Sequence, residues 1–268
     1  MAIFAYEFMH RAFIVGVLLA IIIPCIGIIV VLKRLSMMGD ALSHTALAGV
    51  AGGLIMGINP ILGAIAACIL AALGIELIRK KIPRYAEMSI AIIMSAGVGL
   101  AGVLSGFVKN PASFNSFLFG SIVAISDFEL TLVICISGIV LGSFLLLYKE
   151  LFFITFDENS ARLAGIPVKT INFIFTVLTA ITVSIASRTV GALIVSSLMV
   201  VPVACAMQFG KSYKQTILFS IGFAVLFTVS GLFLSFYAGV KPGGTIVLLG
   251  VIFLLVILTM KKIISKNL

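Results

Sequence analysis

The sequence predicts an all-α polytopic membrane protein, a helical bundle of eight or nine transmembrane segments. The chain has 268 residues, of which 62% are hydrophobic and only 10% are charged, and its mean hydropathy is +1.32. A soluble domain carries about 25% charged residues, so this composition excludes that class. The apolar runs are long and do not alternate with polar residues, which favours helices over the strands of a membrane barrel.

Nine apolar segments follow one another along the chain. They cover residues 13–32, 44–58, 60–77, 88–108, 130–148, 171–186, 190–209, 217–237 and 245–260. A membrane-spanning helix needs about 20 apolar residues, so we expect the short second, sixth and ninth segments to be tilted, broken or completed by polar flanks. No stretch between the segments is long enough for a soluble domain, and residues 1–268 are expected to form a single transmembrane domain.

The basic residues predict the orientation, because cytoplasmic loops of membrane proteins are enriched in Lys and Arg. One side receives Arg79, Lys80, Lys81, Arg84, Lys149, Arg162, Lys169, Lys211, Lys214, Lys261, Lys262 and Lys266, and the other only Lys109, Arg188 and Lys241. The expected arrangement is a multi-pass protein of the cell membrane with its C-terminus in the cytoplasm. Nine spans would leave the N-terminus outside with Lys33 and Arg34 inside, whereas eight would reverse both. The net charge of +9 therefore indicates a lipid environment and no nucleic-acid partner.

The most informative stretch is residues 33–53, which holds Asp40 and His44 between two apolar segments. On a helix their i, i+4 spacing puts both side chains on one face, with Ser43 beside them. A carboxylate and an imidazole so placed can bind a divalent transition metal. The other interpretation is that Asp40 caps the helix and His44 bonds to a backbone carbonyl.

Two ligands are fewer than the four that zinc prefers. Two copies of the chain around a twofold axis would supply two Asp40 and two His44 side chains. Water or a partner's side chain could equally complete the shell.

The loop of residues 149–170 predicts a short helix on the cytoplasmic face. Asp157 is a good N-cap, Glu158 adds negative charge to the first turn, and Gly165 before Pro167 is a good stop. Such a helix can dock into a groove of a soluble subunit. An ordinary surface helix is the alternative interpretation.

These stretches resemble, in order and spacing, the permease subunits of ABC importers for first-row transition metals, the zinc and manganese group. The Gly-Asp-x-Leu-Ser-His motif of residues 39–44 is the most specific part of the resemblance, which covers essentially the whole chain. The other matching stretches are residues 8–12, 32–34, 117–121, 157–167, 190–193 and 199–202.

The resemblance implies a permease that pairs with a second copy, with ATP-binding subunits on the cytoplasmic side and an extracytoplasmic metal-binding protein above. ATP would be hydrolysed on another subunit, so the chain itself is expected to be no enzyme and to carry the metal only as cargo. Asp40 and His44 match the residues that contact or gate the metal. The resemblance places the contact with the ATP-binding subunit on Asp157, Ala161, Arg162, Leu163, Ala164 and Gly165.

Residues 119–122, 187–191 and 199–204 look more like zinc permeases, so zinc is the expected metal and manganese or iron the alternative. An ion-coupled secondary transporter would need several intramembrane carboxylates, but only Asp40 qualifies. An intramembrane metalloenzyme would need at least three ligands, and the chain's only histidines are His10 and His44. Arg188 could equally be an anchor that snorkels to the outer membrane surface, and it is assigned no transport role.

Overall fold

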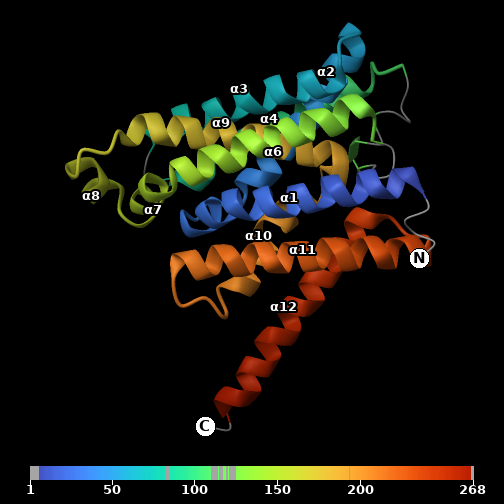
Figure 1. Ribbon diagram of the computed structural model, residues 1–268. Coiled ribbons are helices and arrows are strands. Elements are labelled where there is room, and N and C mark those ends of the chain that lie inside the picture. The colour runs from blue at the N-terminus through green and yellow to red at the C-terminus, as the bar shows by residue number, and fades with distance from the viewer. Residues whose placement is uncertain are drawn as a thin grey trace.

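The computed structural model describes residues 6–82, 85–109, 114, 117, 118, 120, 125–192 and 194–266, and these contain helices and no strand (Figure 1). The predicted all-α class is confirmed. The helices are α1 (Glu7–Leu32), α2 (Met38–Met56), α3 (Pro60–Lys81), α4 (Ala86–Ser105), α6 (Asp127–Leu146), α7 (Tyr148–Phe156), α8 (Glu158–Leu163), α9 (Val168–Ala186), the π-helix η3 (Ser187–Gly191), α10 (Val195–Ala206), α11 (Tyr213–Ala238) and α12 (Pro242–Lys266).

Seven spans in the described part of the chain are long and apolar enough to cross a membrane: α1, α3, α4, α6, α9 continued by η3, α11 and α12. The other two predicted segments correspond to α2 and α10. Helix α2 packs against α3, α4, α9 and α10, which bury most of its residues and explain how it tolerates polar and small residues. Helix α10 has 12 residues, about 18 Å of helix, and is shorter than the roughly 30 Å hydrocarbon core.

The structure corrects the predicted segment 190–209, which is not one helix. Val190 and Gly191 complete the π-helix that continues α9, and α10 begins only at Val195. Gly191 has a φ of 111°, a backbone conformation that glycine adopts without a steric penalty. Because the residues on both sides of this break are apolar, hydropathy alone could not reveal it.

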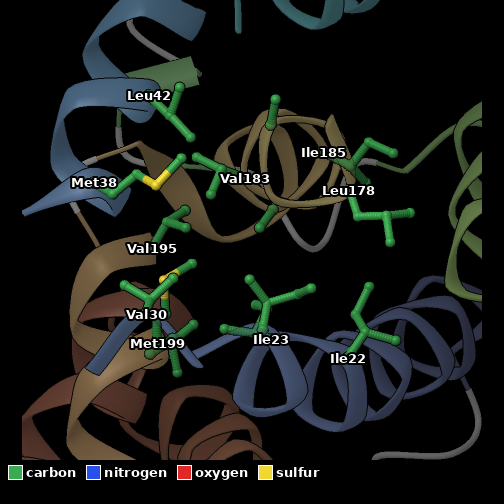
Figure 2. Close-up of a cluster of buried hydrophobic side chains, with 14 of the residues drawn as sticks. Ile22, Ile23, Val30, Met38, Leu42, Leu178, Val183, Ile185, Val195 and Met199 are labelled. Carbon is green, nitrogen blue, oxygen red and sulfur yellow. The ribbon is translucent and has the colours of Figure 1, made fainter. Parts of the chain in front are cut away.

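Helices α1, α2, α9 and α10 meet in the core. Figure 2 shows Ile23 and Val30 of α1, Met38 of α2, Val183 of α9 and Met199 of α10 converging there. Glycines allow some neighbouring helices of the bundle to approach each other closely.

A Cβ on Gly27 of α1 would overlap the carbonyl oxygen of Met199, and one on Gly49 of α2 would overlap that of Gly63 in α3. Small residues of this kind let membrane helices pack backbone to backbone.

The two ends of the bundle differ in charge. The N-terminal end of α1 is fixed by Arg11, whose guanidinium pairs with Glu7 at 2.6 Å and with Asp127 at 2.7 Å. The opposite end holds α7 and α8 (Figure 1). There the Nζ of Lys33 donates a hydrogen bond to Oδ1 of Asn172 at 2.8 Å. The structure thus places Lys33 at the end that carries the basic loops, opposite the N-terminus.

Candidate functional site

Asp40 and His44 lie one turn apart near the start of α2, and both side chains are half-buried. Met38 and Leu42 of the same helix point into the core that α2 shares with α1, α9 and α10 (Figure 2). Each residue turns an α-helix by about 100°, so Asp40 is about 200° away from both Met38 and Leu42. The carboxylate and the imidazole therefore share the face of α2 that is turned away from this core.

Neither side chain is engaged in a hydrogen bond or ion pair with another described residue. The N-cap of α2 is Met37, without a side-chain hydrogen bond, so Asp40 does not cap the helix. The Ser43 hydroxyl is buried and donates to the backbone oxygen of Asp40 at 2.9 Å, which removes it from the predicted group. The pair thus consists of one carboxylate and one imidazole, both with free lone pairs.

Close packing fixes the position of this pair. Gly39 lies against Ser196 at the start of α10, where a Cβ on the glycine would be 3.2 Å from the serine Cα. On another side of α2, Thr45 packs against Gly97 of α4. Helix α2 is therefore held between α10 and α4, immediately before and after the two polar residues.

The described residues contain no group of three or more His, Cys, Asp and Glu side chains that could hold a metal ion. One chain thus offers two protein ligands at Asp40 and His44. Zinc sites use four ligands when structural and at least three protein ligands when catalytic. A third His, Cys, Asp or Glu ligand for a metal at this pair would have to come from outside the described part of this chain.

The short helix predicted after residue 156 is present as α8. Its N-cap, Asp157, accepts hydrogen bonds from the amides of Asn159 at 2.9 Å and Ser160 at 3.1 Å. The hydrogen bonds of the Ser160 side chain and backbone, together with that of Asn159, lower the pKa of Asp157. Gly165 follows the helix with a φ of 82°, as a C-terminal stop requires.

Helix α8 divides into an anchored side and an exposed side. Ala161 is completely buried, so it fixes the helix to the bundle and is unavailable to a partner. Leu163 is 90% exposed, and Arg162, Ala164 and Gly165 are also exposed. The accessible part of the predicted contact surface is thus Asp157 and Arg162 to Gly165.

At the other end of the bundle, Arg188 contacts two other side chains of the protein. Its Nε donates to Oε1 of Glu129 at 2.8 Å, and its guanidinium carbon lies 4.6 Å from the ring centre of Phe117. Glu129 also closes a capping box with Ser126 at the start of α6. The local sequence predicts the capping box. It does not predict that Glu129 pairs with Arg188, which lies 59 positions away.

Some residues of the stretches that resemble the permease family lie outside the described residues. Residues 119, 121 and 122 of the stretch that favoured zinc belong there, as does Leu193.

The seven long apolar helices and the capped surface helix together define a multi-pass membrane protein. The chain belongs to the ABC 3 transport family, which it matches over residues 5–261. The resemblance drawn from the motifs is thereby confirmed.

Relatives with different names align over almost the whole chain. A "Probable metal transport system membrane protein" of Treponema pallidum is 34% identical and covers 96% of this chain and 97% of its own. The "Manganese transport system membrane protein MntC" of Listeria monocytogenes is 33% identical, with coverages of 92% and 88%. The "High-affinity zinc uptake system membrane protein ZnuB" of Haemophilus influenzae is 28% identical, with coverages of 91% and 94%.

Among solved structures, the fold is similar to that of "PsaBC from Streptococcus pneumoniae in complex with Fab". The TM-score is 0.85 at 29% sequence identity, and the alignment covers 96% of this chain and 92% of that chain.

Proposed function

We propose that the chain is the membrane permease of an ABC importer that moves a divalent first-row transition metal into the cytoplasm. The observation that carries this proposal is the pair of Asp40 and His44, unpartnered among the described residues and turned away from the core on a helix inside the bundle. Ionisable side chains at membrane depth are costly and usually mark a transport path. The names of the relatives support a metal as the cargo.

Zinc is the metal we propose, with manganese as the alternative. Imidazole suits zinc, and carboxylate suits both ions. Relatives named for manganese and for zinc are 33% and 28% identical, so overall similarity gives zinc no advantage. The preference rests on the sequence patterns at residues 187–191 and 199–204.

A second copy of the permease would complete the ligand shell. A twofold axis beside α2 brings two carboxylates and two imidazoles together, which gives the four ligands that zinc prefers. The face of α2 that carries Asp40 and His44 supports this arrangement, because it is turned away from the chain's own core.

The ATP-binding subunit is proposed to dock on α8. The anchor at Ala161 and the cap at Asp157 hold the helix in place, and Leu163 presents an exposed apolar side chain that a groove can bury. Hydrolysis then takes place on that subunit, and this chain transmits the motion.

The basic end is proposed to face the cytoplasm, which places the C-terminus there in the cell membrane. The end with the N-terminus of α1 and the Glu129–Arg188 pair then faces outward, where an extracytoplasmic metal-binding protein delivers the ion. Lipid surrounds the outer helices.

Equilibrium dialysis of the purified permease with radioactive zinc or manganese tests the metal site. We expect about one zinc ion per two chains, and loss of that ion in Asp40→Asn and His44→Gln. Ser43→Ala is the matched control, because its hydroxyl bonds only to the helix backbone. Full zinc binding by both variants would overturn the proposed site, and tighter manganese binding would overturn the choice of zinc.

A further inference from the structure

A cavity of about 610 Å³ opens at the basic end of the bundle, between the end of α3, helix α8 and the start of α9. Helices α7 and α8 form this end (Figure 1). Four cationic side chains from these three helices line the cavity: Arg79, Lys80, Arg162 and Lys169. Positively charged side chains from distant parts of the sequence thus lie around one cavity.

The carboxylates in the cavity do not balance these charges. Glu76 is shared between Arg79 at 2.7 Å and Lys80 at 3.6 Å, and Glu158 reaches Arg162 only at 3.7 Å. Lys169 has no ion pair within the described part of the chain. The cavity therefore carries a net positive charge that an anion would complement.

Lys33 adds a further cation beside the cavity. Its Nζ donates to Oδ1 of Asn172, a residue that lines the cavity. Burial lowers the pKa of Lys33 to about 8, and the nearby charge of Arg79 contributes to this shift. The N-terminus of α9, which carries Lys169 and Asn172, contributes its positive helix dipole in the same direction.

The surroundings of the cavity indicate which kind of anion it binds. Leu70 and Leu77 lie two turns apart on one face of α3 and are 71% and 62% exposed. Lys80 follows Leu77 by about one turn on the same side, so the two leucines form an apolar track that leads to Lys80. An acyl chain on this track would bring its headgroup to the cavity. Basic pockets between membrane helices at the cytoplasmic side are suited to acidic headgroups.

We propose that this cavity binds the phosphate of an anionic phospholipid, held by Arg79, Lys80 and Lys169. The same phosphate would also face Arg162 of α8 and so tie the lipid to the helix proposed to meet the ATP-binding subunit. The binding itself is independent of the proposed transport function.

Native mass spectrometry of the purified full-length chain tests this site. Phosphatidylglycerol, phosphatidylcholine with the same acyl chains, and inorganic phosphate are titrated separately. We expect phosphatidylglycerol to bind tightest, and Lys80→Gln/Lys169→Gln to weaken its binding on the order of tenfold. Lys211→Gln/Lys214→Gln is the matched control, because it removes the same charge from exposed positions at the same end, outside the cavity.

Equal binding of the two lipids would overturn the proposal, as would an equal loss in the control variant. Binding of inorganic phosphate without any preference for phosphatidylglycerol would identify free phosphate as the ligand and contradict the lipid source. If Lys80→Gln/Lys169→Gln still binds zinc, a failure of the lipid site can be distinguished from a failure of the metal site.

Discussion

Glu129 and Arg188 form an ion pair of 2.8 Å that joins the first turn of α6 to the π-helix after α9. Their side chains are only 11% and 18% exposed. The pair ties together two segments on the side where the metal is proposed to enter. A π-helical turn often marks a functional position, and here it presents Arg188 to both Glu129 and Phe117.

Arg188→Gln is expected to lower the free energy of unfolding by about 3 kcal/mol, because it leaves the Glu129 carboxylate buried without its cation. Thermal unfolding in detergent measures the effect. The double variant Glu129→Gln/Arg188→Gln should lose less than the sum of the single variants. Strictly additive losses would show that the two side chains are not coupled.

Gly27→Ala is expected to cost about 2 kcal/mol of stability, because the new methyl group overlaps the carbonyl oxygen of Met199. Gly102→Ala is the matched control, since a Cβ there meets no atom within 4 Å. Equal melting temperatures for the two variants would contradict the close approach of α1 and α10.

Asp157→Ala is expected to loosen α8, because the amides of Asn159 and Ser160 lose their acceptor. Hydrogen exchange of these amides should become faster, while Asp157→Asn, which can still cap, should retain most of the protection. The folded pKa of Asp157 lies below its ordinary value, so the stabilisation is complete above about pH 4. It is lost as the pH falls through the folded pKa, and protection that did not change in acid would rule out the cap.

Lys33 gives a pH dependence of the same sign in a higher pH range. Its folded pKa of about 8 lies below the ordinary value, so the unfolded chain binds more protons between these two values. Stability is therefore expected to rise with pH from about 8 to about 10. Unfolding measured across this range should show the slope in the wild type and a smaller slope in Lys33→Gln, and an unchanged slope would refute the assignment.

The sequence was sufficient to predict the features that depend on local pattern. Apolar segments predicted the long helices, and the polar sequence from Asp157 to Gly165 predicted α8 with its cap and stop. The spacing of Asp40 and His44 predicted that they share a helix face.

Features that depend on distant partners were not predictable in this way. The ion pair of Glu129 with Arg188 joins residues 59 positions apart. The break between η3 and α10 lies inside an uninterrupted apolar run. The burial of Ala161 depends on how α8 packs against the bundle, which the helix's own six residues do not specify.

ATP-driven uptake of radioactive zinc into vesicles tests the central claim most directly. The vesicles contain the permease with its ATP-binding subunit, and the metal-binding protein is supplied outside. Asp40→Asn and His44→Gln are each expected to reduce uptake by about tenfold or more, while Ser43→Ala transports normally and all variants assemble with the ATP-binding subunit. Undiminished zinc uptake by both Asp40→Asn and His44→Gln would contradict the account and place the metal path elsewhere in the bundle.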